Sequence, residues 1–373
     1  MIGLSCAWRL AQAGARVAVL ERGEPGGGAT RVAAGMLAPV GELTFGEPEL
    51  LELTLAAARL YPDFVAELEA ATGENTGYER LGALHVALDR DEAAQLRRVH
   101  DLQRSLELEA EWLAPRRCRE LEPGLTPSFH GGVLAAGEAA VDPRALTRVL
   151  AVAMAGEGGE VRTGTEVVDG IFAGERLAGV RVADGEEVYA DAVVLASGAW
   201  SGATSWLPED ARPPVRPVKG QVLELRGRGQ EPVASHILAS ERIYLVPRAD
   251  GRLIVGATVE EMGFDTTVTA GGVHELLREA YRLLPDIAEM ELLGVTAGLR
   301  PGTPDNLPLV GPGALAGLVL ATGHFRNGIL LAPLAAEAIA DLLTDAPAPN
   351  RRSSFHEVSR GKDERRPQAE VAR

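Results

Sequence analysis

A glycine, an amphipathic helix, a short strand and an acidic residue follow one another in the first 21 residues of the chain. Gly3 opens a segment whose apolar residues recur at helical spacing and which ends at Gly14. Residues 16–21, RVAVLE, then form an apolar run typical of a strand buried on both faces. In a dinucleotide-binding unit the last glycine of G-x-G-x-x-G begins the helix, and an acidic residue about 20 positions later binds the ribose. Gly3 and Glu21 fit this spacing, although a purely structural helix and strand also remain open.

Length, charge and cysteine content limit the class of protein. The chain has 373 residues, of which 46% are hydrophobic and 24% charged, so it can form two globular domains. Its formal charge of −16 argues against nucleic acid and anionic membranes as partners, because both require a basic surface. Cys6 and Cys118 cannot form a disulfide framework, and no Cys/His cluster has the spacing of metal ligands. No apolar run approaches the roughly 18 residues that cross a bilayer, and the start lacks a basic signal-peptide region, which predicts a cytoplasmic protein.

Helical and strand patterns succeed one another along the chain and predict a mixed α/β protein. The helical patterns cover residues 48–72, 90–108, 144–155, 273–284 and a stretch that ends near 343. Strand patterns lie at residues 83–88, 160–162, 189–196, 291–297 and 317–323. From Pro214 to Ala257 the pattern is antiparallel, with a hairpin that turns at Asp250-Gly251.

Four longer motifs identify the family that the chain resembles. They are ATRVAAGMLAP (29–39), RPVKGQ (216–221), AGLRPGTPDNLPLVG (297–311) and ATGHFRNGILLAP (321–333). Together they resemble the FAD-dependent D-amino-acid oxidase superfamily and, within it, the glycine oxidases of thiazole (thiamine) biosynthesis. The resemblance covers about residues 2–345, and the last two motifs are specific, because so many fixed positions rarely coincide by chance.

The resemblance implies an α/β fold in two domains. One is a Rossmann-type FAD-binding domain whose first strand is missing from this chain, and the other is an α+β substrate domain built on an antiparallel sheet. The FAD-binding domain would comprise residues 1–80, 141–213 and 297–345, and the substrate domain residues 81–140 and 214–296. Residues 346–373 are too polar to pack and are expected to form a mobile tail.

The resemblance also implies non-covalent FAD and the residues that bind it. Glu21 would bind the adenosine ribose, Val167 the adenine, and residues 34–36 would lie along the flavin ring. Backbone amides at helix N-termini would bind the pyrophosphate without adding charge. The expected cofactor-binding residues are Ile2, Gly3, Glu21, Arg22, Ala29, Thr30, Ala34, Gly35, Met36, Val167, His324, Phe325, Arg326, Asn327, Gly328, Ile329 and Leu330. The alternatives are a surface loop for residues 26–35, a core position for Val167 and a loop-structuring role for His324.

Two arginines, a tyrosine and a methionine are the substrate-binding residues that the resemblance implies. Arg300 can bind a planar carboxylate with two parallel hydrogen bonds, which a lysine cannot do. Tyr244 would add a phenol hydrogen bond, Arg326 is the second arginine candidate, and Met36 would line the pocket. Each of Arg300, Tyr244 and Arg326 could instead be structural. Lys219 is expected to form an ion pair, with assistance to O2 reduction as its alternative role.

The implied reaction is flavin-dependent oxidative deamination of glycine, with transfer of the Cα hydride to FAD and reoxidation by O2. Its products are glyoxylate, ammonia and H2O2. Position matters more than acid–base catalysis in such a transfer, so we expect no general base and no metal. A pocket that presents arginine but no carboxylate would favour the neutral amine of the substrate. The partners would be a small amino acid, O2 and further copies of the chain in a homo-oligomer, with a functional link to thiazole synthase.

Two alternatives and a question about the chain start remain open. A related FAD-dependent sarcosine or D-amino-acid oxidase would share these motifs. An inactive fragment that does not hold FAD is the second alternative, since the strand and the pyrophosphate turn before Gly3 are absent. The hypothesis that we favour is a misassigned start, because this family has Val or Ile where Met1 stands, and a GTG valine codon can be taken for an initiator.

Overall fold

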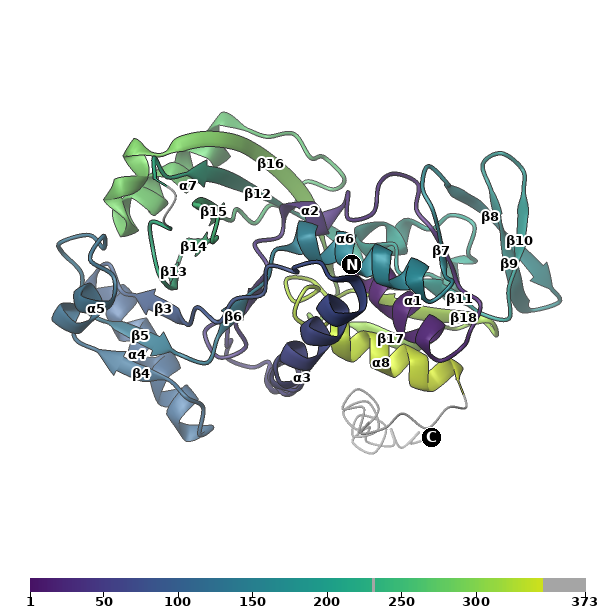
Figure 1. The fold of residues 1–373 in the computed structure, drawn as a ribbon, viewed down its shortest axis with the longest axis horizontal. Helices are drawn as coiled ribbons and strands as arrows, with labels where there is room; N and C mark the ends of the chain where they lie inside the picture. The colour runs from purple at the N-terminus through teal and green to yellow at the C-terminus, as the bar shows by residue number, and fades with distance from the viewer. Residues whose placement is uncertain (230–231, 345–373) are drawn as a thin grey trace, which may run out of the picture.

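The computed structural model describes residues 1–229 and 232–344 (Figure 1). Its α-helices are α1 (Ile2–Gln12), α2 (Ala29–Val32), α3 (Pro48–Thr72), α4 (Arg90–Ser105), α5 (Pro115–Leu121), α6 (Pro143–Gly156), α7 (Ala270–Leu283) and α8 (Ala332–Leu343). Its short 3-10 helices are η1 (Gly198–Ala203), η2 (Glu209–Ala211) and η3 (Pro285–Glu289). The tail predicted for residues 346–373 lies outside the described residues.

The largest sheet has eight strands in the order β16-β12-β15-β14-β13-β3-β5-β4. These strands are β3 (Ala83–Val86), β4 (Glu111–Leu113), β5 (Gly132–Ala135), β12 (Arg216–Arg226), β13 (Ile237–Ala239), β14 (Tyr244–Pro247), β15 (Arg252–Gly256) and β16 (Glu291–Gly302). Neighbouring strands are antiparallel, except that β13 and β3 are parallel. α7 packs on β12 and β15, where Leu223, Val255 and Leu276 belong to one buried apolar core.

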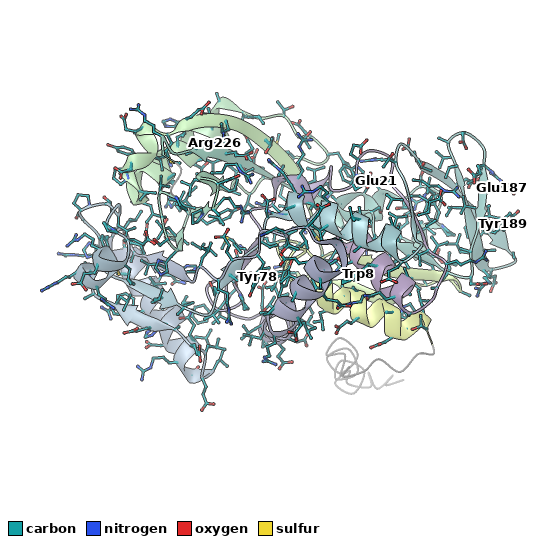
Figure 2. The ribbon with its side chains drawn as sticks, viewed as in Figure 1. Trp8, Glu21, Tyr78, Glu187, Tyr189 and Arg226 are labelled. Atoms are coloured by element: carbon teal, nitrogen blue, oxygen red, sulfur yellow. The ribbon has the colours of Figure 1, made fainter. Side chains whose placement is uncertain are left out.

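Parallel strand pairs and four helices form the other large part of the molecule. The parallel pairs are β1 (Ala18–Leu20) with β7 (Glu160–Arg162), and β11 (Val193–Leu195) with β18 (Leu318–Thr322). β17 (Leu309–Pro312) adds an antiparallel strand to β18. α1, α3, α6 and α8 pack around a second buried core that contains Trp8, Phe64 and Leu150. Figure 2 shows Trp8 within this helical layer, where its ring meets Phe64 edge-on at 5.6 Å.

Two small sheets complete the fold. β8 (Val167–Ala173), β9 (Arg176–Val182) and β10 (Glu187–Tyr189) form an antiparallel meander at the end of the molecule opposite α5 (Figure 1). β2 (Met36–Leu37) pairs with β6 (Ala139–Ala140), which follows β5 of the large sheet. This pairing joins the segment after α2 to the end of the large sheet.

The predicted α/β class is confirmed, and two long-range features differ from the sequence patterns. The helix predicted at 48–72 is α3, and the predicted turn at Asp250-Gly251 joins β14 to β15. The strand predicted at 291–297 continues to Gly302, across the predicted domain boundary at 297, because β16 pairs with β12 along its length. The strand predicted at 189–196 is shorter, because Tyr189 pairs with Gly179 in the meander instead.

Candidate active site

The end of β1 brings Glu21 to the first turn of α1. The Glu21 amide donates to the Arg162 carbonyl (2.9 Å), and the Glu21 carbonyl accepts from the Thr165 amide (2.9 Å). Burial lowers the pKa of the Met1 α-ammonium group, and the nearby Glu21 carboxylate raises it. The first turn of α1 with Ile2 and Gly3, Glu21 and the turn that precedes Val167 therefore lie together.

An arginine and a tryptophan bound one side of this region. The Arg22 guanidinium lies 4.2 Å from the centre of the Trp200 ring, which stacks on Phe264 at 6.0 Å. A Cβ atom at Gly28 would lie 3.6 Å from the same ring, so the glycine-rich loop passes over it just before α2 begins with Ala29 and Thr30. Sequence reasoning missed Trp200, and the available signal was its place directly after a buried strand.

Residues 34–36 form a short strip that leads from α2 into β2. The Gly35 carbonyl accepts from the Val141 amide (2.9 Å), and the Ala34 carbonyl accepts from Arg248. Gly35 has a φ of +73°, and an added Cβ would collide with the Val141 carbonyl, so the position requires glycine. Met36 and Tyr244 pack against one small buried core, which places the strip beside the large sheet.

Tyr244 and Arg300 reach over the large sheet from different strands, above two glycines. A Cβ atom at Gly256 would touch the Tyr244 ring, and one at Gly220 would touch the Arg300 guanidinium. Nη1 of Arg300 donates to the carbonyls of Thr258 (3.1 Å) and Lys219 (3.3 Å), which fixes the plane of the guanidinium. Burial raises the pKa of the Tyr244 phenol, and the hydrogen-bonded, positive Arg300 opposes that rise. The two predicted substrate-binding side chains thus face each other.

The loop between β18 and α8 brings Arg326 to the same place. The Phe325 amide donates to the carbonyl of Pro301 (2.9 Å), the residue after Arg300. Arg326 is exposed, its guanidinium lies 5.7 Å from the Phe325 ring, and its charge lowers the pKa of Tyr244. His324 is buried, which lowers its pKa to about 3 and keeps it neutral, and its Nε2 has no hydrogen-bond partner among the described residues.

Glu42 is an acidic residue that the sequence interpretation missed. Its carboxylate raises the pKa of Tyr244, and it lines one pocket with Arg326, Asn327 and Glu47. Residues 38–47, between β2 and α3, thus bring a negative charge close enough to act on Tyr244. The expectation of a pocket that presents no carboxylate to the substrate amine stays a prediction. The motif around Met36 gave no signal for Glu42, since Glu42 follows it in an irregular segment.

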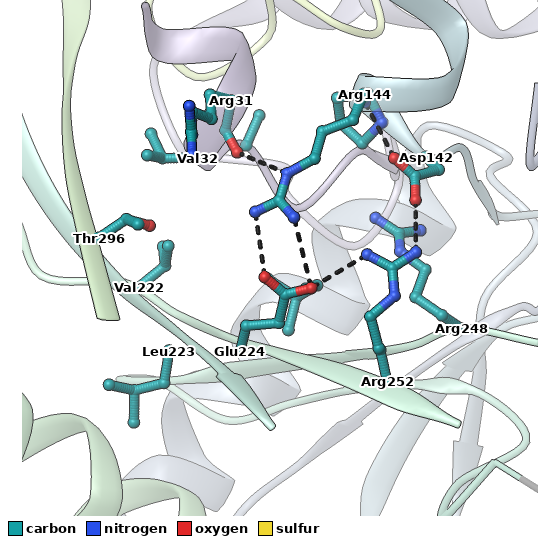
Figure 3. Close-up of a pocket in the computed structure, with 13 residues that line it drawn as sticks. Arg31, Val32, Asp142, Arg144, Val222, Leu223, Glu224, Arg248, Arg252 and Thr296 are labelled. Carbon is teal, nitrogen blue, oxygen red and sulfur yellow. Dashed lines mark hydrogen bonds and ion pairs between the residues drawn. The ribbon is translucent and has the colours of Figure 1, made fainter. Parts of the chain in front are cut away.

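A network of ion pairs lies on another side of the Tyr244 hairpin (Figure 3). Arg252 donates to Asp142 (2.8 Å), the N-cap of α6, and to Glu224 (3.0 Å) on β12. Arg144, in the first turn of α6, pairs with the other Glu224 oxygen at 3.1 Å. The hairpin that carries Tyr244 is thereby joined to the helix that follows Val141, the partner of Gly35.

Several other expectations concern single residues or absent groups. Lys219 is fully buried with its Nζ 3.3 Å from Glu260 Oε2, so the expected ion pair is confirmed. Within residues 1–229 and 232–344, no three or more His, Cys, Asp or Glu side chains come together in a way that could hold a metal ion. Over the same ranges, no helix has the length and apolar character needed to cross a membrane.

Comparison with known proteins decides the family. The family described as DAO, FAD dependent oxidoreductase, matches residues 1–342. The chain belongs to the DAO family of FAD-dependent oxidoreductases. It is 36% identical to a glycine oxidase from Geobacillus kaustophilus over 92% of this chain and 90% of that protein. The solved structure of glycine oxidase from the same organism has a TM-score of 0.84 at 34% identity and covers 93% of this chain and 94% of that one.

A second group of relatives is longer than the chain. The bifunctional protein ThiO/ThiG from Trichormus variabilis is 37% identical over 358 residues, which are 95% of this chain but 53% of that protein. The chain therefore spans about half the length of these bifunctional relatives. The predicted resemblance to the glycine oxidases of the DAO family is confirmed, and the chain is an FAD-dependent oxidoreductase.

The DAO family assignment makes FAD the cofactor, and two observations of this structure fit it. Gly35 packs its buried backbone against the Val141 carbonyl with no room for a side chain, which fixes the course of the strip predicted to lie along the flavin. The buried Nε2 of His324, in the loop predicted to cover the flavin, has no hydrogen-bond partner in the part of the chain that the structure describes. The residues that would hold FAD are the predicted ones at the start of α1, at the end of β1, in the strip and in the loop before α8.

Proposed function

We propose that this DAO-family chain is a glycine oxidase, which converts glycine to glyoxylate, ammonia and H2O2 with FAD and O2. The observation that carries the proposal is the pair of Tyr244 and Arg300 side chains, which face each other beside the strip at residues 34–36. Relatives named glycine oxidase support this choice over sarcosine and D-amino-acid oxidation. Those two reactions remain the alternatives.

Arg300 would orient the substrate through its carboxylate. Because two carbonyls hold Nη1, the guanidinium plane is fixed and its remaining N–H groups can donate to a carboxylate in one orientation. The raised pKa of Tyr244 keeps its hydroxyl protonated, so it can donate to the same carboxylate at neutral pH. FAD, when bound, accepts the electrons removed from the substrate and passes them to O2.

Arg326 and Glu42 would set the charge around the substrate amine. Arg326 disfavours an ammonium group and Glu42 favours one, so their balance controls which protonation state of the amine binds. No general base is needed, because the neutral amine carries the lone pair that drives Cα–H cleavage. Met36, the remaining residue expected to line the substrate pocket, lies in the strip and packs against the same small buried core as Tyr244.

A link to thiazole synthase also belongs to this proposal. The bifunctional relatives are named ThiO/ThiG, so a second activity is joined in one chain with the part that resembles this protein. We propose that the imine or glyoxylate formed here is used by a thiazole synthase. A cytoplasmic location, a homo-oligomeric assembly and the division into FAD-binding and substrate domains remain predictions.

The test is measurement of bound flavin and of oxygen uptake. The purified chain should show flavin absorbance in a one-to-one ratio and should consume O2 with glycine faster than with sarcosine or D-alanine. Arg300→Lys should keep the flavin and lose most of the rate at low glycine concentration. A flavin-loaded protein without glycine turnover would refute the substrate, and a colourless protein would favour the inactive fragment.

A further inference from the structure

A cluster of buried polar side chains lies beneath the loop that leads from the strip to Glu42. Glu138, in the turn between β5 and β6, is 2% exposed, and its Oε1 accepts from the amides of Val40 (2.9 Å) and Gly41. Gln103, on α4, is also buried, and its Nε2 donates to the Val40 carbonyl (2.9 Å). The side chains of Glu138 and Gln103, from two distant segments, therefore both bind the backbone of this loop.

Three buried atoms of this cluster have no hydrogen-bond partner among the described residues: Glu138 Oε2, His85 Nε2 and Gln103 Oε1. The first two lie within 3.0 Å of the point where a side chain at Gly41 would begin, so they face the same space. His85 comes from β3, which pairs with β5. Glu138 and His85 thus place a carboxyl oxygen and an imidazole nitrogen beside the same space, and neither atom has a hydrogen-bond partner among the described residues.

The charges around Glu138 are of the wrong sign for an ionised carboxylate. Glu42, the charged neighbour that acts on it, is itself acidic, and Glu109 lies near the same turn at Gly137. An ionised carboxylate that is buried without a cation is strongly destabilised in a protein interior. A protonated Glu138 avoids that cost and supplies the O–H donor that a neutral imidazole nitrogen lacks.

We propose that Glu138 is protonated in the working enzyme and donates from Oε2 to His85 Nε2, directly or through one buried water, and that this neutral pair positions the loop that carries Glu42. Burial raises the pKa of Glu138 to about 8 and lowers that of His85 to about 4, which agrees with a neutral pair at pH 7. Glu138 is a positioning residue, and the claim about substrate rests on the proposed function.

The pair has a consequence for substrate binding at alkaline pH. Above pH 8 Glu138 ionises, the donor to His85 is lost, and two carboxylates, Glu138 and Glu42, repel each other across the loop. The loop that carries Glu42, whose charge acts on Tyr244, is then held less firmly. Carboxylate binding at Arg300 and Tyr244 should weaken over the same pH range.

The experiment compares the flavin-loaded wild type with Glu138→Gln, Glu138→Ala and Glu111→Gln, the last an exposed glutamate on β4 of the same sheet. The probe is acetate, whose Kd is read from the flavin absorbance on both sides of pH 8. Infrared difference spectra of wild type minus Glu138→Gln at pH 7 test for the C=O stretch of a protonated carboxyl. This band does not depend on turnover.

The proposal predicts a protonated-carboxyl band that the wild type has and Glu138→Gln lacks, and a wild-type acetate affinity that falls above pH 8. Glu138→Gln should bind acetate as the wild type does at pH 7 and keep that affinity at alkaline pH, because an amide can accept from both loop amides and donate to His85. Glu138→Ala should bind roughly tenfold more weakly at every pH, since it leaves the half-buried amides of Val40 and Gly41 without their acceptor. Glu111→Gln should match the wild type.

Three results would overturn the proposal: no difference band, a Glu138→Gln variant as weak as Glu138→Ala, or an alkaline loss of affinity that persists in Glu138→Gln. The last would assign the titration to another group. Failure of glycine turnover with these acetate and infrared results intact would refute the proposed function alone.

Discussion

Replacing Arg252 with methionine should destabilise the protein by about 3 kcal/mol at pH 7 and weaken substrate binding. Arg252 begins β15, on the hairpin that carries Tyr244, and makes charge-assisted hydrogen bonds to Asp142 (2.8 Å), Glu224 (3.0 Å) and Asp250 (2.7 Å). It therefore joins the hairpin to the N-terminus of α6 and to β12 (Figure 3). Methionine keeps the apolar stem and removes the charge.

The magnitude follows from the burial of the three partners. The side chains of Asp142 and Glu224 are 15% and 19% exposed, whereas that of Asp250 is 51% exposed. A charged hydrogen bond to a buried partner contributes about 1.5–3 kcal/mol, and a surface pair contributes about 0–1 kcal/mol. Glu224 keeps its ion pair with Arg144 in the variant, so breaking its hydrogen bond to Arg252 costs less free energy. The hydrogen bonds to Asp142 and Glu224 are only partly buried, so each contributes toward the lower end of that range, and the exposed bond to Asp250 contributes almost nothing. Together the lost hydrogen bonds amount to about 3 kcal/mol of unfolding free energy.

The effect should depend on pH in one direction. Burial raises the pKa of Asp142 and Glu224, but the hydrogen bonds and charges of the arginines outweigh it, so both are lowered in the folded protein. Stability from a lowered carboxylate pKa is complete above the unfolded pKa of about 4 and is lost as the pH falls through the folded pKa. The difference between wild type and Arg252→Met should therefore be complete at pH 7 and shrink below about pH 4.

Denaturant unfolding followed by tryptophan fluorescence measures this difference, and acetate titration of the flavin measures the binding effect. The matched control is Arg226→Met, because Arg226 lies opposite Arg252 across β12 and β15 but is exposed (Figure 2). It should change the unfolding free energy by less than about 0.5 kcal/mol. The reasoning is refuted if Arg252→Met has the unfolding free energy of the wild type, or if the difference in unfolding free energy between the two does not shrink at low pH.

Three further predictions concern Gly35 in the strip, the phenol of Tyr244 and Gly220 beneath the Arg300 guanidinium. Gly35→Ala should lose FAD from the purified protein, because the added Cβ meets the Val141 carbonyl. The control Gly46→Ala, at a φ of +85° with no atom within 4 Å of the added Cβ, should retain FAD, and equal flavin absorbance in the two variants would contradict the prediction. Tyr244→Phe should raise KM for glycine roughly tenfold with little change in kcat, since a binding hydrogen bond is lost; Tyr189→Phe, at an exposed tyrosine, should leave KM unchanged. Gly220→Ala should displace the Arg300 guanidinium and weaken acetate binding as much as Arg300→Ala does, whereas wild-type affinity would show that the guanidinium has room to move.

Local sequence rules were sufficient for the elements that position the site. The turn at Asp250-Gly251 fixes the β14–β15 hairpin, because these residues favour the backbone of a tight hairpin turn. The apolar strand that ends at Glu21 and the helix that begins after Met1 also follow from short-range patterns. Such features depend on a few neighbouring residues, which the sequence contains in full.

Side chains that depend on long-range packing could not be predicted in this way. The loop that carries Glu42 is held by Glu138, which binds the Val40 amide across 98 positions of sequence, and by Gln103, which binds the Val40 carbonyl across 63. No periodicity in residues 38–47 carries that information. Tyr244 and Arg300 similarly share a face because β14, β15, β12 and β16 pair in this order, which sets Tyr244 over Gly256 and Arg300 over Gly220.

The net charge of −16 now has a structural counterpart in the way anionic groups are bound. A chain with this charge does not attract carboxylates at long range, so affinity for a substrate carboxylate must come from local donors. Arg300 provides them with a guanidinium whose plane two carbonyls fix, while the exposed Arg326 adds a second positive charge that acts on Tyr244. Glycine is a zwitterion without net charge, so the negative field does not repel it during approach. A substrate with two carboxylates would be repelled, and its kcat/KM should rise with salt as screening weakens that repulsion, whereas the value for glycine should stay nearly constant.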